Sequence, residues 1–583
     1  MENFDLVIVG AGWHGLAMAK TYSEVCPDAS LLIIDSATSI GGTWAKERLY
    51  PGLKTNNIVG SYEFGDFPMT PERFGVKPGQ HIPGTVVHEY LRQFAEQFGL
   101  VSRLRLQTKV ESAELHETGE WLLRVRRQAE NGGASCLKAR RLVVATGLTS
   151  EPYVPNYAGR ESFTGNFFHS RQLRDRAKDI QASKEVVVVG ANKSAWDVCY
   201  SAAISGAHVN MVIRPEGGGP SWVWPVMFSP FKLSIQRMAT TRLFTLFEPC
   251  IWAGGSGFNL VRRLLHQTWL GRQLVKLFWK ILANPVLSAN AYHKHPELRK
   301  LKPWASMFWM GNSLGVHNYE TNWFELVEQG RITVHIADVS SLADNEVHLS
   351  NGEVLHADTF VCCTGWRVAP PIKFMPPSVA PQLGLPGSEK AETKYLVKHA
   401  DEEIFKAVPG LRAGPIKVLP DGLGPIHVSG DTLAHAPYRL YRFMVPPAKI
   451  FLDHRNIAFI GAHLALNAIT VAQAQALWIT AFFQHKIPKL NSSTTTHQDI
   501  EYQTILQSEY CRWRHPPTGG GAGGRCPDLV FDGLLYTDLL LQDVGINNFR
   551  KRNVWEELFD RYLPKDYAGM TGELRNRMRS GHS

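Results

Sequence analysis

The 583-residue sequence predicts an α/β fold built around two largely parallel β-sheets. Two segments, at residues 5–35 and 185–214, each read as a β-branched strand, a glycine-containing turn, a helix and a second strand. The chain is too long for one ordinary core, so we expect two or three domains. With 44% apolar and 20% charged residues, the composition is that of a folded protein and argues against disorder along the whole chain.

The first segment has every part of a dinucleotide-binding unit. Residues 6–9 (LVIV) form a strand of the buried type, and the turn GAGWHG follows at residues 10–15. In such a G-x-G-x-x-G turn, Gly10 permits the sharp bend, Gly12 lets the backbone approach a pyrophosphate, and Gly15 lets helix and strand pack closely. The helix that follows presents free N–H groups and a partial positive charge to the phosphates.

The second strand of this segment ends on Asp35, twenty residues after Gly15. A carboxylate there can accept hydrogen bonds from a ribose and disfavours a 2′-phosphate. The first site is therefore predicted to hold FAD or NAD, not NADP.

The second segment repeats this pattern with two departures. Its turn reads GANKSA, so Asn192 and Ala195 stand where the second and third glycines usually are. Asparagine tolerates unusual backbone angles, although a purely structural βαβ unit remains an alternative. The next strand ends on Arg214, and a cation there suits an adenosine 2′-phosphate. The predicted NADPH-binding residues are Gly190, Asn192, Ser194, Ala195 and Arg214.

Short motifs elsewhere in the chain point to one family. Residues 41–44 read GGTW, residues 64–68 read FGDFP, and residues 163–169 read FTGNFFH. Together with the two nucleotide segments, these motifs resemble those of the class B flavin monooxygenases. That group contains the flavin-containing monooxygenases and the Baeyer–Villiger monooxygenases.

The resemblance extends to three later segments and covers roughly residues 4–215 and 355–480. Residues 143–147 (VVATG) resemble the strand that returns near FAD, and residues 361–365 (VCCTG) look like its second copy. Residues 456–461, followed by a helix through Gln475, resemble the segment that closes the FAD site.

Two positions bear on the type of enzyme. The family's linker motif carries an aromatic residue four positions after its histidine, whereas Leu173 follows His169 here. Baeyer–Villiger enzymes carry an aspartate six residues after the tyrosine of a Y-P-G run, whereas this chain has Asn56 after Tyr50. Asn56 also aligns with the active-site asparagine of the flavin-containing branch. We therefore favour the flavin-containing type, with Baeyer–Villiger oxidation of a polyketide ketone as the alternative.

The resemblance implies a monooxygenase that uses FAD and NADPH. NADPH would reduce FAD, reduced FAD would add O₂ to give a C4a-(hydro)peroxide, and one oxygen atom would pass to a lipophilic small molecule. Asn56 is the implied catalytic residue, and the chain looks like fungal members associated with secondary metabolism. A flavoprotein oxidase or reductase without oxygen transfer, and a degenerate nucleotide-binding scaffold, remain alternatives. The residues expected at FAD or beside it are Gly10, Gly12, Gly15, Asp35, Gly42, Thr43, Trp44, Thr55, Asn56, Val110, Ala145, Thr146, Gly147, Thr364 and Gly365.

The same reasoning predicts two Rossmann-like domains, a discontinuous FAD-binding domain and an NADPH-binding domain inserted into it, with two additions. The Ser/Thr and Gly runs of residues 492–525 are expected to form flexible loops, and the tail after residue 526 to pack back on the FAD-binding domain. The expected boundaries are 1–165 and 361–490 for the FAD-binding domain, 166–360 for the NADPH-binding domain, 216–330 for an aromatic-rich helical insertion, and 491–583 for a C-terminal extension.

The insertion contains a basic amphipathic segment. No acidic residue lies between Glu248 and Glu297, and residues 259–282 predict one helix whose apolar side chains repeat near period 3.6. One hypothesis is a membrane-surface helix that feeds a lipophilic substrate to the flavin. The other is a helix packed on its own protein, with its cations in water.

Composition excludes several other classes. The net charge is +9, but no Lys/Arg cluster sits on a known nucleic-acid-binding motif, so no nucleic-acid partner is predicted. None of the eight cysteines forms a C-x-x-C pair, so neither a metal site nor a dithiol relay is predicted. No signal peptide and no apolar run of about 18 residues is found. We expect a cytoplasmic protein, with membrane-surface association as the open alternative.

Overall fold

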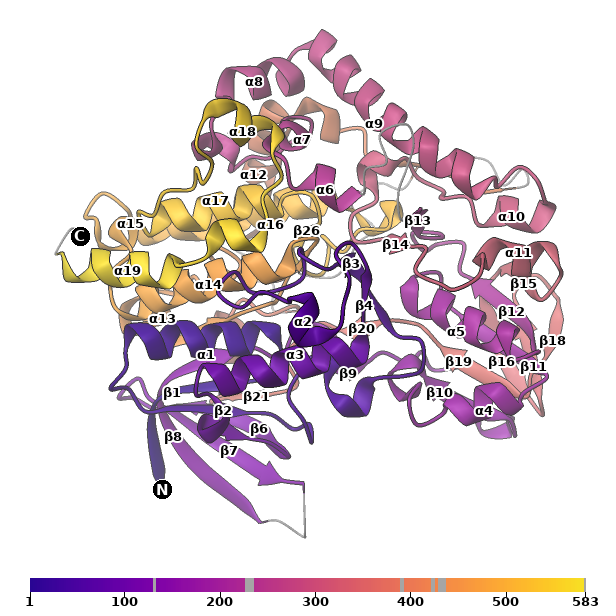
Figure 1. Ribbon diagram of the computed structural model, residues 1–583, viewed down its shortest axis with the longest axis horizontal. Helices are drawn as coiled ribbons and strands as arrows, with labels where there is room; N and C mark the ends of the chain where they lie inside the picture. The colour runs from indigo at the N-terminus through magenta and orange to yellow at the C-terminus, as the bar shows by residue number, and fades with distance from the viewer. Residues whose placement is uncertain (129–132, 226–234, 388–392, 421–424, 428–436, 581–583) are drawn as a thin grey trace.

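The computed structural model of the chain describes residues 1–128, 133–225, 235–387, 393–420, 425–427 and 437–580. Two β-sheets lie side by side, the first at the lower left and the second at the right of Figure 1. Helices of the insertion form the upper edge, and the C-terminal helices lie between them and the first sheet. The predicted α/β class is confirmed.

The first sheet is built on the first predicted nucleotide segment. Strand β1 (Glu2–Val9) pairs in parallel with β2 (Leu31–Ile34) and β8 (Ala134–Val144), and α1 (Trp13–Val25) joins β1 to β2. Strand β24 (Ile457–Phe459) returns from far along the chain and pairs in parallel with β8. The sheet is completed by β5 (Leu104–Arg105), β6 (Thr108–Leu115), β7 (Trp121–Arg127) and β21 (Lys373–Met375).

Helix α14 (Ala468–Phe483) fills the core above this sheet. All but its first residue are buried, because the helix is apolar on every side and packs against both α1 and α17 (Gly533–Asp543). Helix α17 of the C-terminal tail therefore lies over the same sheet. Helix α19 (Met570–Arg579) adds a contact to α1.

The second sheet is entirely parallel, and helices α5 (Lys193–Ile204) and α11 (Trp323–Glu328) pack against it and each other. Trp196 and Trp323 meet there with ring centroids 4.0 Å apart. Strand β19 spans the predicted boundary at residue 360 and pairs over its whole length within this sheet. The strand order is β10 (Asn166–His169), β19 (Thr359–Cys362), β11 (Glu185–Val189), β12 (His208–Ile213) and β15 (Ile332–Ile336).

Both sheets make the same close contact at their first glycine. A Cβ on Gly10 would lie 2.3 Å from the carbonyl oxygen of Ala145, and a Cβ on Gly190 would lie 2.5 Å from that of Cys363. Both glycines have a positive φ, +121° and +145°, which favours glycine. The two Thr-Gly strands thus occupy equivalent places, one in each sheet, and the predicted second copy belongs to the second sheet.

The insertion differs from its predicted form. The single helix expected over residues 259–282 is two helices, α8 (Asn259–Gln267) and α9 (Trp269–Asn290). They part at Thr268, whose hydroxyl accepts a hydrogen bond from the backbone N–H of Gly271 (3.0 Å) and so caps α9. A Cβ on Gly271 would lie 2.0 Å from the Leu264 carbonyl oxygen, so glycine permits the close approach of the two helices.

The prediction of flexible loops over residues 492–525 is wrong. Helix α16 (His497–Arg514) occupies most of this segment and starts with a capping box between Thr496 and Asp499. The glycine run after it is packed: a Cβ on Gly521 would lie 2.2 Å from the His515 carbonyl oxygen, and one on Gly523 would lie 1.9 Å from that of Cys511. These glycines allow backbone segments to pack closely. A glycine-rich composition is found both in such packed segments and in flexible ones, so composition alone could not predict which occurs here.

Buried ion pairs join the insertion to the C-terminal segment. Arg242 of α7 (Arg242–Leu246) bonds both Asp538 and Glu557, and all three side chains are at least nine-tenths buried. Breaking one partner of such a pair leaves an uncompensated buried charge, which typically costs about 3–5 kcal/mol. The two segments therefore behave as one packed unit beside the sheets.

Candidate functional site

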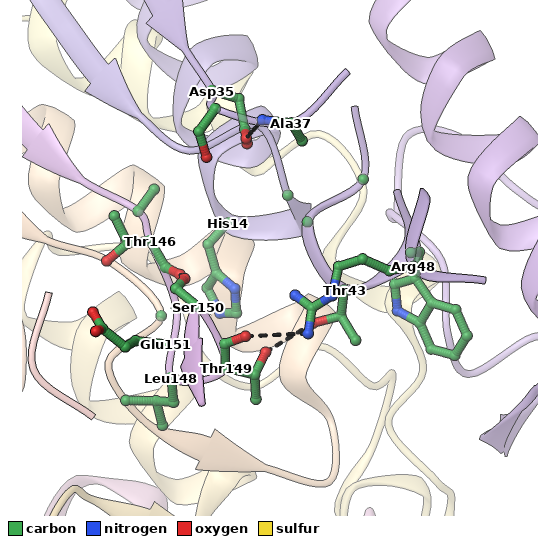
Figure 2. Close-up of a pocket in the computed structure, with 18 of the residues that line it drawn as sticks. His14, Asp35, Ala37, Thr43, Arg48, Thr146, Leu148, Thr149, Ser150 and Glu151 are labelled. Atoms are coloured by element: carbon green, nitrogen blue, oxygen red, sulfur yellow. Dashed lines mark hydrogen bonds between the residues drawn. The ribbon is translucent and has the colours of Figure 1, made fainter. Parts of the chain in front are cut away.

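A cavity of about 980 Å³ lies at the carboxyl ends of β1, β2 and β8. Ligands of parallel α/β sheets bind at this edge, because the loops and helix N-termini that follow the strands converge there. Three regions of the chain line it, within residues 9–48, 108–172 and 461–469, together with Tyr62 and residues 371–372. Figure 2 shows part of this lining.

The glycine turn opens onto the cavity. A Cβ on Gly12 would meet only ordinary contacts, the nearest being the Gly42 Cα at 3.5 Å, so this backbone lies beside the GGTW motif without being sealed by it. A Cβ on Gly15 would lie 1.9 Å from the Gly10 carbonyl oxygen, so only glycine fits at the third position of the motif. Helix α1 starts here, and within the described residues no side chain caps it. Its free N–H groups fit a pyrophosphate.

Asp35 lies in the cavity at the end of β2 (Figure 2). Its Oδ2 accepts a hydrogen bond from the Ala11 N–H (2.7 Å) and its Oδ1 accepts one from the Ala37 N–H (2.8 Å). Burial raises the pKa of this carboxyl. Each oxygen keeps a further lone pair, so the side chain can both fix the turn and accept hydrogen bonds from a ligand hydroxyl.

Two neutral histidines face each other in the cavity wall. The rings of His14 and His463 are 5.3 Å apart, and burial lowers the pKa of His14 to about 4 and that of His463 well below its usual value. Within the described residues, neither nitrogen of His463 nor Nε2 of His14 has a hydrogen-bond partner. A buried polar atom without a partner costs about 1–3 kcal/mol. These nitrogens are thus available to a ligand without adding charge.

Arg48 and the linker histidine meet on another side of the cavity. The Arg48 guanidinium donates to the Thr149 carbonyl oxygen (3.1 Å; Figure 2) and lies over the Trp366 ring. Burial lowers its pKa to about 10, so it stays charged at neutral pH. His169 Nε2 lies 3.0 Å from the Gly365 carbonyl oxygen and its ring also meets Trp366.

Sequence reasoning missed Arg48, His14 and His463 as cavity residues. His14 and His463 carried a signal, since one stands within the glycine turn and the other follows the segment thought to close the site. Leu173, which replaces the expected aromatic residue, is buried in the core of the second sheet. That core accommodates an aliphatic side chain at this position.

The structure brings most predicted residues of the first site together. Gly10 and Gly15 stand directly behind the cavity in the turn. Those that line it are Gly12, Asp35, Gly42, Thr43, Trp44, Val110, Ala145, Thr146 and Gly147.

Thr55 and Asn56 lie on β3 (Lys54–Ile58), outside the lining of this cavity. The Thr55 hydroxyl is used within the protein, because it donates to the Asn57 carbonyl oxygen (2.6 Å) and accepts from the Ile82 N–H (3.0 Å). The Asn57 amide donates to the Leu466 carbonyl oxygen (3.1 Å), between residues 464 and 468 of the cavity wall. Strand β3 is thus hydrogen-bonded to a segment that carries cavity-wall residues at both of its ends, although β3 itself does not line the cavity.

The predicted residues of the second site lie at the matching edge of the second sheet. Gly190, Asn192, Ser194 and Ala195 form the turn and the first residues of α5, and Arg214 follows β12 with its side chain exposed. Asn192 Oδ1 accepts hydrogen bonds from the hydroxyls of Ser221 (2.8 Å) and Ser313 (3.2 Å). The asparagine thus ties the turn to the insertion.

Two further groups complete the surroundings of the second site. Burial and the neighbouring Glu216 raise the pKa of Asp338, and the nearby Arg214 acts in the opposite direction. The Thr364 hydroxyl donates to the Tyr153 carbonyl oxygen, and the Tyr153 N–H donates to the Gly365 carbonyl oxygen. Thr364 and Gly365 therefore lie beside the wall of the first cavity, at Pro152 and His169, without lining it.

Comparison with known proteins gives the family. Residues 7–238 match the pyridine nucleotide-disulphide oxidoreductase family model. The FAD-dependent monooxygenase rstn6 of Aspergillus nomiae is 33% identical over 98% of both chains, and resA of Aspergillus sclerotiorum is 34% identical over the same shares. The fold resembles that of cyclohexanone monooxygenase from Rhodococcus sp. Phi1 bound to NADP⁺, with a TM-score of 0.58 and 16% identity over 93% of this chain and 98% of that one. These relatives and the two nucleotide-type turns agree: the chain belongs to the FAD-dependent monooxygenases.

Proposed function

We propose that this monooxygenase takes its electrons from NADPH and oxygenates a lipophilic small molecule in secondary metabolism. The observation that carries the cofactor assignment is the pair of equivalent strand–turn–helix units, of which one is followed by Asp35 and the other by Arg214. An acid favours a free ribose, whereas a cation favours a 2′-phosphate. The fungal relatives support the secondary-metabolism part.

We assign the first cavity to FAD, in a domain formed by the strands of the first sheet. When bound, FAD supplies the hydride acceptor and the site of O₂ activation. The backbone at Gly12 and the start of α1 would hold its pyrophosphate, and Asp35 its ribose. Neutral His14 and His463 would offer hydrogen bonds without changing the charge of the site.

Asn56 is proposed as the catalytic residue beside the flavin, with Thr55 next to it. Its support is the resemblance and the hydrogen bond that ties β3 to the segment between cavity-wall residues Leu464 and Ala468. An amide can donate and accept hydrogen bonds but carries no charge, unlike the aspartate of the Baeyer–Villiger branch. We therefore favour the flavin-containing type of reaction.

Anaerobic reduction tests the electron donor. Purified enzyme with FAD bound is mixed with NADPH or with NADH in the absence of O₂, and the loss of visible flavin absorbance is followed. We expect NADPH to reduce the flavin far faster than NADH at equal concentration, because only NADPH carries the phosphate that Arg214 would bind. Equal rates with the two donors would contradict the assignment of the second site.

We also propose that α8 and α9 bind the surface of an anionic membrane. Their outer face (Figure 1, upper edge) exposes large apolar side chains, among them Leu260 at 81%, Trp269 at 68% and Leu270 at 64% exposure. On α9, Leu270, Leu274, Leu277 and Ile281 follow the spacing of one helix face, and exposed apolar side chains gathered on one face mark an interaction site. The patch, named here the α8–α9 surface, consists of Leu260, Val261, Leu264, Trp269, Leu270, Leu274, Leu277 and Ile281.

Charge favours a lipid occupant of the α8–α9 surface. Arg263, Lys276 and Lys280 are exposed on the same helices, and no acidic residue occurs from 249 to 296. Each such cation near an anionic membrane is worth about 1 kcal/mol. Arg262 does not contribute, because its guanidinium is buried and donates to the hydroxyl of Thr245 (2.9 Å). Among the described residues, no helix is long and apolar enough to cross a membrane.

Sedimentation with phospholipid vesicles tests this contact. Vesicles with an anionic lipid should pull down the wild-type enzyme, and vesicles without it should bind less. The double variant Lys276→Glu with Lys280→Glu lowers the net charge by about four and should weaken binding at least tenfold. The double variant Trp269→Ser with Leu270→Ser, which removes exposed apolar side chains, should have an effect of the same size. Ile204→Ser, an exposed apolar residue on α5, is the matched control. Unchanged binding by both double variants would remove the proposal.

A further inference from the structure

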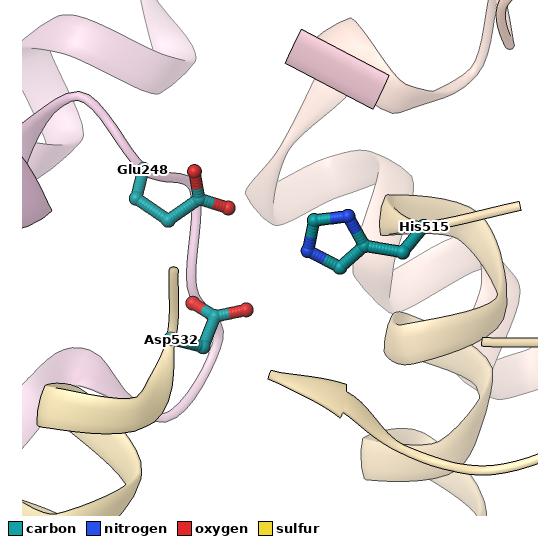
Figure 3. A group of neighbouring side chains, drawn as sticks. All are labelled: Glu248, His515 and Asp532. Atoms are coloured by element: carbon teal, nitrogen blue, oxygen red, sulfur yellow. The ribbon is translucent and has the colours of Figure 1, made fainter. Parts of the chain in front are cut away.

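Three fully buried side chains meet where the insertion joins the C-terminal segment. Glu248 follows α7, His515 ends α16, and Asp532 precedes α17. One ligand atom from each residue lies within 4.8 Å of the other two. Figure 3 shows the His515 ring facing the two carboxylates. Glu248 is far in the sequence from His515 and Asp532, and all three lie outside the lining of the FAD cavity.

His515 is the observation that points to a ligand. The side chain is wholly buried, and neither ring nitrogen has a hydrogen-bond partner among the described residues. Asp532 Oδ1 is equally buried and without a partner there. Most buried polar atoms of native proteins are paired, so two such groups aimed at one point need an explanation.

Glu248 is held in position by Arg514. The guanidinium bonds both carboxylate oxygens, with Nη2–Oε2 at 2.6 Å, and its Nη1 donates to the Phe308 carbonyl oxygen. A carboxylate has about four lone-pair sites, so two remain for another partner. Outer hydrogen bonds of this kind orient the carboxylates that bind metal ions. Arg514 therefore leaves Glu248 able to act as a ligand.

The charge of the group favours a cation. Glu248 and Asp532 bring two negative charges when ionised and the neighbouring Asp528 adds a third, whereas Arg514 and Arg262 bring two positive charges. The balance is negative, and a buried negative charge is costly unless it is compensated. A divalent cation compensates it, because such an ion binds ionised carboxylates and a neutral imidazole.

We propose that Glu248, His515 and Asp532 bind one Zn²⁺ ion. One imidazole nitrogen with two carboxylate oxygens is a ligand set that zinc accepts, and a water molecule would complete the tetrahedron. Because all three side chains are inaccessible to solvent, the role is structural: the ion fastens the insertion to the C-terminal segment. The competing state holds a proton on Asp532 in place of the metal.

Metal content decides between the two states. The full-length enzyme with FAD bound, produced in zinc-supplemented medium and freed of any affinity tag, is desalted and analysed by elemental mass spectrometry. We expect about one zinc ion per chain. His515→Gln should contain no zinc above background. His266→Gln is the matched control, since His266 is another buried neutral histidine but bonds the Leu246 carbonyl oxygen (2.9 Å); it should retain the zinc.

Thermal unfolding gives a second readout that does not need a stable variant. A strong chelator should lower the unfolding temperature of the wild-type enzyme and of His266→Gln, and should leave that of any folded His515→Gln unchanged. A folded wild-type enzyme that contains FAD but no zinc, with an unfolding temperature indifferent to chelator, would overturn the proposal. That result would assign the buried proton to Asp532.

Discussion

Gly12→Ala is expected to weaken FAD binding severely while the protein stays folded. The φ of Gly12 is −85°, which any residue adopts, and the nearest atom to an added Cβ is the Gly42 Cα at 3.5 Å, an ordinary contact. The protein therefore accepts the methyl group, but this group occupies the place where the backbone must approach a pyrophosphate. We expect a loss of at least tenfold in FAD affinity, about 1.4 kcal/mol.

Titration of the apoprotein with FAD, followed by flavin fluorescence, measures this loss, and thermal unfolding of the apoprotein checks the fold. Gly15→Ala gives the contrast, because its Cβ would lie 1.9 Å from the Gly10 carbonyl oxygen, and overpacking of this kind typically costs about 1–3 kcal/mol of stability. Gly572→Ala in α19 has open space around it and is the control. Wild-type affinity in Gly12→Ala would remove the cavity from consideration as the pyrophosphate site.

Arg214→Ala is expected to reduce the preference for NADPH over NADH about ten- to hundredfold. Hydrogen bonds between charged groups contribute about 1.5–3 kcal/mol, which corresponds to that range of affinity. Because NADH lacks the 2′-phosphate, its kcat/KM should change less than about twofold. The measurement is flavin reduction with each donor under anaerobic conditions.

Arg299→Ala is the matched control for Arg214→Ala. Arg299 is an exposed arginine on α10 (Pro296–Lys300), which packs against β15 of the same sheet. Its loss removes one positive charge from the region without touching the predicted strand end. If Arg214→Ala lowers kcat/KM equally for NADPH and NADH, the arginine stabilises the fold and does not bind the 2′-phosphate.

Local spacing made the two strand–turn–helix units predictable. Gly10, Gly12, Gly15 and Asp35 fall within one βαβ unit, so their order along the chain fixes their positions in space. The second unit was also recognisable from its strand and helix. Asn192 has an ordinary extended conformation (φ −102°), so the tolerance of asparagine for unusual backbone angles is not needed in this turn. In each case the chemistry follows from a strand end and the helix after it.

Contacts between distant segments could not be predicted in this way. His463 meets His14 only because β24 returns to the first sheet, and periodicity gave no indication that Arg262 faces inward on α8. The glycines after α16 were predicted to form a flexible loop. Glycine content alone does not distinguish a flexible segment from one in which backbones pack closely. Glu248, His515 and Asp532 form no short motif with metal-ligand spacing, so the sequence does not indicate that they meet.

The reaction of the NADPH-reduced enzyme with O₂ tests most directly whether the enzyme transfers oxygen. The reduced enzyme is mixed rapidly with O₂ in the absence of substrate, and its absorbance and the release of H₂O₂ are followed together. For an oxygen-transferring enzyme with a water-excluding cavity, we expect a transient species that absorbs in the near-UV and outlives the mixing step before the oxidised flavin spectrum returns. Immediate return of the oxidised flavin, with H₂O₂ released in the same phase and no transient, would contradict oxygen transfer and identify an oxidase.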